Sequence, residues 1–159
     1  MATMKWKGLD EYLAKLERIH SPKEYIGEAI YDGAGIVADA VKAQINALPV
    51  HNQYLPPDEK SRGITSQQKR GLQEGFGISK MKKDGDFYNV KLGFEGYNGQ
   101  KTKKYQQGQP NSVIARSVCA GTSFRAANDF VGRGTRSAKA QAEQAMKKKF
   151  EEALEKAMN

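Results

Sequence analysis

The spacing of apolar residues predicts a long amphipathic helix near the beginning of the chain, at about residues 21–48. Apolar or small side chains recur there every three or four residues, as they do along one face of a helix, at Ile26, Ala29, Ile30, Gly33, Val37, Ala40, Val41, Ile45 and Leu48. Ser21 and Glu24 form a capping box around Pro22, which is tolerated in a first helical turn. Pro49 ends the pattern. An apolar stripe of this length needs a partner to cover it.

A shorter amphipathic helix is predicted at about residues 8–20, immediately before the long one. Inside the long helix, residues 33–38 read Gly-Ala-Gly-Ile-Val-Ala and match the GxGxxA pattern of dinucleotide-binding loops. That pattern binds a dinucleotide where a strand leads into a helix, whereas here it lies within continuous helical periodicity. We interpret residues 33–38 as a helix face whose small side chains allow close packing.

The apolar pattern changes from helical to strand-like spacing near residue 71. Alternation is strict in the second half of this region, at Tyr88, Val90, Leu92 and Phe94. Residues 83–86, Lys-Asp-Gly-Asp, have the composition of a tight hairpin turn. The sequence therefore predicts a β-hairpin with strands at about 72–81 and 86–95. Its apolar face is expected to cover the stripe of the long helix.

Two polar segments show neither helical nor strand spacing. Residues 49–70 contain Pro56-Pro57 followed by charged and polar residues, and residues 96–111 are rich in glycine and lysine. Long segments of this kind within a domain are usually functional or disordered. We predict flexible loops at about 49–70 and 96–111.

The last third of the chain is predicted to be mostly helical. Residues 111–121 fit a short helix with Asn111 as its cap and Gly121 as its end, although the frequent β-branched residues leave a strand open. Residues 122–130 read as an extended segment that could form a further strand. Helical spacing returns at about residue 137 and continues to the C-terminus.

This order of elements predicts a single α+β domain over residues 1–159. A small antiparallel sheet with a β-hairpin is expected to pack against the long N-terminal helix and the C-terminal helix. Hydrophobic residues make up 38% of the 159 residues, so the core is expected to be modest. No stretch reaches the ~18 consecutive apolar residues of a membrane span, and no signal peptide is expected. The single cysteine, Cys119, excludes an internal disulfide and suggests a reducing compartment.

The net charge of +8 is concentrated in one part of the chain. Residues 101–136 contain one acidic residue, Asp129, against seven basic ones: Lys101, Lys103, Lys104, Arg116, Arg125, Arg133 and Arg136. These seven residues are our candidate site, as a basic surface that meets a polyanion or an acidic partner. The alternative is a solvated loop in which the charges provide solubility.

The sequence gives little support to an enzyme. The two histidines, His20 and His51, have no metal-ligand spacing, and Cys119 has no base nearby in the sequence. Asp84 and Asp86 are explained by the hairpin turn. The chain contains neither a phosphate-binding GxxxxGK[ST] loop nor an HExxH motif. No catalytic residue, metal or cofactor is therefore expected.

The chain resembles the neck or tail-completion proteins of long-tailed bacteriophages. The resemblance lies in the paired N-terminal helices, in residues 71–76 (GLQEGF) followed by the charged turn 82–86 (KKDGD), and in residues 115–122 (ARSVCAGT) with Phe130 before a last helix. It covers about residues 5–158. The chain departs from the family pattern in two places. Cys119 and Ala120 replace an acidic and an aromatic residue, and Gly132 and Gly134 stand where proline is usual.

This resemblance implies a structural virion protein, made in the host bacterial cytoplasm and located at the head–tail junction. It would act by ring assembly and protein–protein contacts, with six copies implied by the family. The implied partners are the tail terminator or tail tube protein and the head connector protein, with nonspecific contact to genomic DNA and none to a membrane. The alternative function is a small basic nucleic-acid-binding protein, which the pI of about 9.5 favours.

Overall fold

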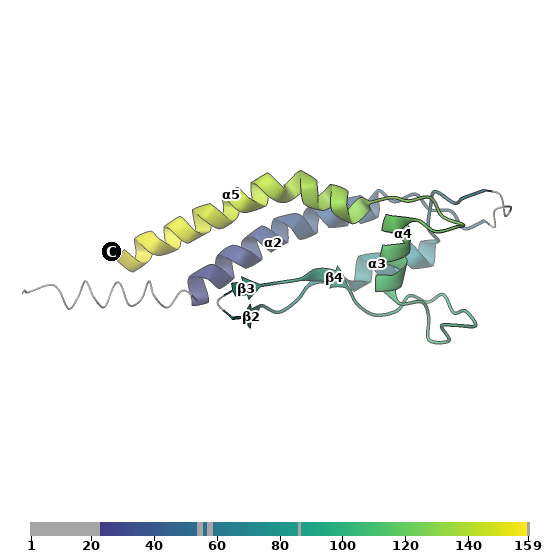
Figure 1. Ribbon diagram of the computed structural model, residues 1–159, viewed down its shortest axis with the longest axis horizontal. Coiled ribbons are helices and arrows are strands. Elements are labelled where there is room, and N and C mark those ends of the chain that lie inside the picture. Colours follow the sequence, from purple (N-terminus) through teal and green to yellow (C-terminus); the bar gives the residue numbers. More distant parts are fainter. Residues whose placement is uncertain (1–22, 54–55, 57–58, 86, 159) are drawn as a thin grey trace, which may run out of the picture.

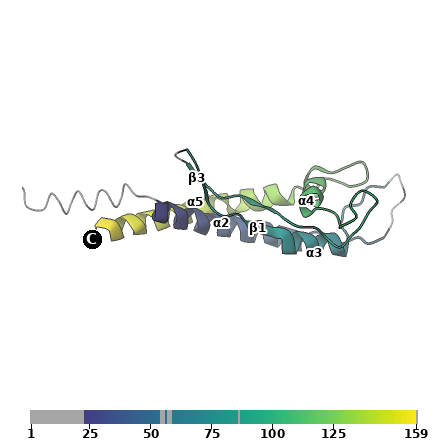
Figure 2. The same ribbon diagram turned by 90° about the horizontal axis from the view of Figure 1, so that it is seen from below.

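Two long antiparallel helices form the axis of the molecule (Figures 1 and 2). The computed structural model describes residues 23–53, 56, 59–85 and 87–158. Helix α2 spans Lys23–Asn46 and helix α5 spans Phe130–Met158. Between the two helices, Lys149 Nζ lies 3.7 Å from Asp32 Oδ2. The predicted long helix is confirmed, but its Ser21 cap and the helix at 8–20 lie outside the described residues.

Close packing between α2 and α5 explains two glycines, Gly33 and Gly134. At Gly134 an added Cβ would lie 2.9 Å from Val41 Cα, and at Gly33 it would meet the side chain of Met146. The small-residue helix face predicted at 33–38 is therefore confirmed for Gly33. The predicted start of the last helix near residue 137 is wrong, because the helix begins earlier in the chain. Helix α5 begins at Phe130, since packing against α2 outweighs the low helix propensity of glycine.

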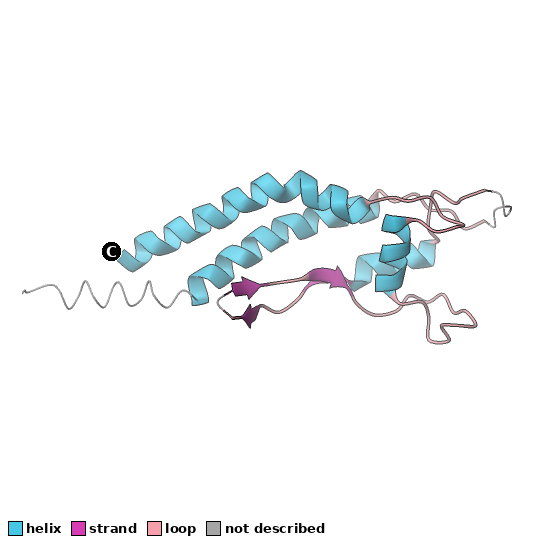
Figure 3. Cartoon of the chain, in the orientation of Figure 1, coloured by secondary structure: helices cyan, strands magenta, loops and turns pink. Residues whose placement is uncertain are grey.

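The predicted hairpin is present (Figure 3), but its first strand starts at Phe76, later than expected. Strand β1 (Phe76–Ile78) pairs antiparallel with β4 (Leu92–Phe94), and β2 (Lys82–Asp84) pairs with β3 (Phe87–Asn89). The register shifts by one residue between the two ladders, so the hairpin is interrupted. Gly85 has a φ of 59°, as the predicted Asp-Gly turn requires.

Helix α3 (Ser66–Gly75) replaces part of a predicted loop and part of a predicted strand. The loop predicted at 49–70 therefore ends at residue 65, and the strand predicted from 72 is helical as far as Gly75. A capping box begins the helix: the Gln68 amide donates to Thr65 Oγ1 at 3.2 Å, and the Thr65 amide donates to Gln68 Oε1 at 3.2 Å. This Thr-x-x-Gln pattern was a readable start signal.

Helix α4 (Asn111–Ala120) occupies the segment for which the sequence left both a helix and a strand open. The helix is therefore confirmed. Pro110 occupies the cap position, so the prediction of Asn111 as cap is wrong. Asn111 is buried instead, and its Nδ2 donates to the Glu95 carbonyl at 2.8 Å. Gly121, with a φ of 74°, ends the helix as predicted. Beyond it the predicted further strand is replaced by a turn in which Thr122 pairs with Arg125.

The core lies where α2, α3, α4, the β1–β4 ladder and the first turn of α5 meet. Its fully buried side chains are Val41, Ile45, Ile64, Leu72 and Phe130. The rings of Phe76 and Phe94 are 5.0 Å apart, and Phe94 meets Phe130 edge-on at 6.0 Å. The predicted α+β fold is therefore confirmed. The hairpin covers α2 only in part, because α5 lies along the length of that helix (Figure 1).

Candidate functional site

The structure places the seven basic candidates in separate environments. Lys101, Lys103 and Lys104 are exposed on the loop before α4, and Arg133 and Arg136 lie on the first turns of α5, beyond the other end of α4. Ten residues of helix separate these two groups, a length of about 15 Å. The predicted single basic surface is therefore divided.

The lysine-rich loop is held by its own hydrogen bonds. The Asn98 amide donates to the Gln109 carbonyl at 2.9 Å. At the tip, the Thr102 amide donates to the Tyr105 carbonyl at 3.0 Å, and the Tyr105 amide donates to Thr102 at 3.1 Å. Residues 102–105, the basic turn, therefore present Lys103 and Lys104 at the tip. The flexibility predicted for residues 96–111 stays a prediction.

The arginines of α5 already contact other side chains. Arg133 Nε donates to Gln44 Oε1 at 3.2 Å and Arg133 Nη2 to Asn128 Oδ1 at 2.7 Å. Arg136 Nη2 lies 3.0 Å from Asp129 Oδ2 in an exposed ion pair. These contacts stabilise the beginning of α5. Arg116, in contrast, is exposed on α4 and forms no ion pair with any described residue.

Arg125 is buried within the subunit, which corrects its assignment to an exposed basic surface. Its side chain is buried, with 8% of the residue exposed. Arg125 Nη1 donates to Ser117 Oγ at 2.7 Å and Nη2 to Gln68 Oε1 at 3.0 Å. Burial lowers the pKa of Arg125, because the charged form loses hydration. This arginine therefore ties the segment after α4 to helices α3 and α4.

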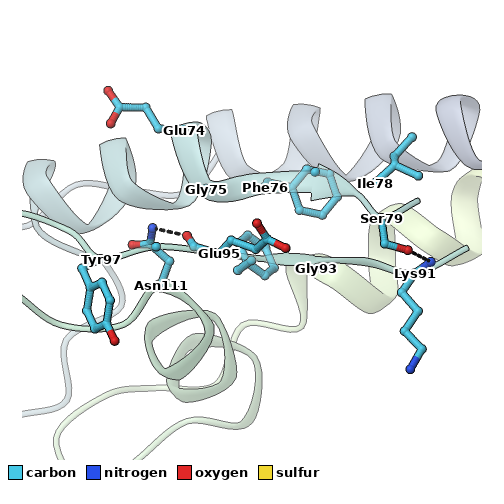
Figure 4. A pocket seen from close by; sticks show the side chains of 13 residues that line it. Glu74, Gly75, Phe76, Ile78, Ser79, Lys91, Gly93, Glu95, Tyr97 and Asn111 are labelled. Carbon is cyan, nitrogen blue, oxygen red and sulfur yellow. Dashed lines mark hydrogen bonds between the residues drawn. The ribbon is translucent and has the colours of Figure 1, made fainter. Parts of the chain in front are cut away.

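A groove runs along the outer face of the β1–β4 ladder (Figure 4). We call it the glycine groove; its volume is about 730 Å³, and it is lined by residues 74–79, 91, 93–97 and 111. Gly77 and Gly93 are paired across the two strands. A Cβ added at either glycine would meet nothing within 4 Å. The floor of the groove is therefore open backbone.

Charged side chains surround this floor. Figure 4 shows the Glu95 carboxylate lying over the ladder beside Gly93, and Lys91 also lines the groove. Glu74, at the end of α3, also lines the groove, and Figure 4 shows its side chain extending away from the two strands. Neither Glu74 nor Glu95 forms an ion pair with a described residue. Tyr97, which is 60% exposed, closes one end.

Sequence reasoning missed this groove, although a signal was present. Isolated glycines inside a strand pattern often mark a place where another backbone or a ligand approaches closely. Gly77 and Gly93 are such glycines. Only the strand register shows that the two lie opposite each other.

The described residues offer little reactive chemistry. Burial raises the pKa of the Cys119 thiol, which keeps it protonated and poorly nucleophilic at neutral pH. Within residues 23–158, apart from the gaps given above, no three His, Cys, Asp or Glu side chains are placed to hold a metal ion. In the same part of the chain, no helix combines the length and apolar character needed to cross a membrane.

Asp129→Asn is expected to lower the melting temperature at neutral pH. Arg136 and, next, the Gly132 amide, which donates to Asp129 Oδ1 at 3.0 Å, hold the pKa of Asp129 below its ordinary value. These two contacts stabilise the fold at pH values above the pKa of Asp129 in the unfolded protein, about 3.9. The stabilisation is lost as the pH falls through the lower pKa that Asp129 has in the folded protein. The difference in melting temperature between the wild type and the variant should therefore disappear at acidic pH.

Thermal melts at several pH values between neutral and strongly acidic would measure this difference. Asn still accepts the Gly132 hydrogen bond, so the variant isolates the loss of charge. The exposed Asp39 on α2 forms no ion pair with a described residue, and Asp39→Asn is the matched control. A difference that persists unchanged into strong acid would contradict the prediction.

Comparison with known proteins adds no assignment. No protein-family model matches the chain, and no curated protein or solved structure matches it.

Proposed function

We propose that this chain is a structural protein of the bacteriophage head–tail junction, which acts by ring assembly and protein–protein contacts and catalyses no reaction. The proposal begins from the sequence resemblance to tail-completion proteins. The observation that carries it is that the residues behind the resemblance build the fold. Leu72 and Phe130 are fully buried, Phe76 and Val118 belong to the same core, and Gly121 has the positive φ that ends α4. A resemblance at these core and helix-end positions supports a shared fold and does not point to a catalytic site.

Two unlike surfaces on one subunit support assembly as the activity. The glycine groove has acidic side chains at Glu74 and Glu95, and the basic turn carries Lys103 and Lys104. A ring of identical subunits requires a heterologous interface, in which one patch meets a different patch on the next copy. The proposed partners are further copies of the chain, six in the family's symmetry, with the tail terminator or tail tube protein and the head connector protein on either side. The proposed location is the virion.

Inactivating the gene in a phage that encodes this chain tests the proposal. We expect filled heads and finished tails that remain separate in electron micrographs, because no junction forms. Adding the purified protein to such an extract should restore joined particles and infectivity. Normal virions from the mutant phage would contradict the proposal.

Nucleic-acid binding is the second candidate function. Exposed lysines beside aromatic rings favour it: Lys104 Nζ lies 5.5 Å from the centre of the Tyr105 ring. Retention on nonspecific duplex DNA over a salt series would separate the two functions. If DNA is the partner, binding should fall steeply with salt, with a logarithmic slope of about −0.9 for each neutralised phosphate. If the structural proposal is right, the protein should be retained only weakly on DNA. Particle assembly should then depend on protein–protein contacts.

A further inference from the structure

We infer that the basic turn of one copy docks into the glycine groove of a second copy, with Lys103 and Lys104 reaching the carboxylates of Glu74 and Glu95. This inference rests on the proposed function, because it names the interface by which copies of the chain would join. It joins two features that are each unpartnered within one subunit. Neither Glu74 nor Glu95 forms an ion pair with a described residue, although Lys91 also lines the groove, and Lys103 and Lys104 form none either.

The groove has the shape to receive a backbone turn. Because Gly77 and Gly93 have no side chains, an incoming main chain can approach the ladder without meeting a Cβ. The volume of about 730 Å³ lies in the range of about 300–1,000 Å³ that holds compact ligands. Glu95 lies over this floor (Figure 4), where an ammonium group from above would meet its carboxylate.

The basic turn is suited to enter the glycine groove. Two hydrogen bonds between Thr102 and Tyr105 fix its backbone, so little conformational entropy is lost on docking. Lys103 and Lys104 are exposed and form no ion pair with a described residue. Opposite charges that face each other across an interface guide association and set its register.

The turn is held away from the groove of its own subunit. Thr65 Oγ1 donates to Gln100 Oε1 at 2.9 Å, and Gln68 Nε2 donates to Gln109 Oε1 at 2.9 Å. These contacts fix both sides of the loop to α3. The loop projects away from the β1–β4 ladder (Figure 1). The occupant of the groove is therefore a turn from another copy, and repetition of this heterologous contact gives a closed ring or an open filament.

Charge exchange on the full chain tests the contact. The turn variant carries Lys103→Glu and Lys104→Glu, and the groove variant carries Glu74→Lys and Glu95→Lys. Self-association of each is measured by analytical ultracentrifugation up to about 1 mM, a concentration that detects contacts as weak as about 4 kcal/mol. We expect each variant alone to associate about tenfold more weakly than the wild type, because both contacts become repulsive. An equimolar mixture of the two should recover association, because each turn then meets a groove of opposite charge.

The control matched to the turn variant is Lys60→Glu with Arg62→Glu, which lowers the net charge by the same amount at exposed positions away from the groove. It should associate like the wild type, and circular dichroism should show that all variants are folded. Several results would overturn the inference. These are no association of the wild type at about 1 mM, equal loss in the control, or no recovery in the mixture. If copies associate but the charge variants have no effect, assembly survives as the function while this interface is wrong. If the turn variant instead loses only salt-dependent DNA retention, the turn belongs to a nucleic-acid site.

Discussion

Phe130→Ala is expected to lower the free energy of unfolding by about 3–5 kcal/mol, the usual range when a buried phenylalanine is truncated. The Phe130 side chain is fully buried, and its ring meets Phe94 at a centroid distance of 6.0 Å. Phe130 is also the first residue of α5, at the end where that helix packs closely against Val41 through Gly134. The substitution would leave a cavity at the place where α5 joins the core.

Urea denaturation followed by circular dichroism would measure this loss. Phe150→Ala provides the control, because Phe150 lies on the same helix but is 39% exposed. We expect the control to cost less than about 1.5 kcal/mol, since a partly exposed side chain loses less apolar contact. Equal losses for the two variants would mean that Phe130 is not part of the core described above.

Arg125→Ala is expected to lower the free energy of unfolding by about 1–3 kcal/mol, because it leaves buried acceptors without their donor. The Arg125 guanidinium serves both Gln68 and Ser117. The backbone beside it is joined to Ser61, whose amide donates to the Phe124 carbonyl at 3.0 Å. Removing the arginine should therefore loosen the segments around residues 59–65 and 122–128 together, and limited proteolysis should cut them faster.

Arg116→Ala is the matched control, since Arg116 is exposed on the neighbouring helix α4. It should leave the free energy of unfolding within about 0.5 kcal/mol of the wild type. A basic-surface role for Arg125 predicts the reverse: normal stability but weaker binding to a polyanion or acidic partner. Chemical denaturation and the DNA salt series, measured on both variants, distinguish these two roles.

Local periodicity was enough to predict α2, the hairpin and the α+β class, whereas for α4 it left a strand open as the alternative. Helical and strand spacing arise from neighbouring residues, and so the patterns at Val41 and Ile45 or at Leu92 and Phe94 can be read without knowing their partners. The same holds for the turn at Gly85 and the end of α4 at Gly121, where the backbone needs a positive φ. These features are properties of short segments.

Helix α3 has a local start signal in its Thr-x-x-Gln capping box, but the burial of α3 and the start of α5 depend on partners that are distant in the sequence. Helix α3 is polar, and its fully buried apolar residue is Leu72. Its capping residue Gln68 also bonds Arg125, which is 57 residues away. At Gly134, glycine permits close packing against Val41, whereas in the sequence it reads as a loop signal.

For the candidate surfaces too, some features could be predicted from the local sequence and others depended on the tertiary structure. Composition located the exposed lysines of the basic turn, because charge is visible in any sequence. It could not distinguish Lys103 from Arg125, since the difference between them is burial, and burial depends on which distant segments pack around a side chain. The glycine groove depends in the same way on the pairing of Gly77 with Gly93 across the hairpin. Desolvation and strand register are set by long-range contacts, which a local pattern of residues does not contain.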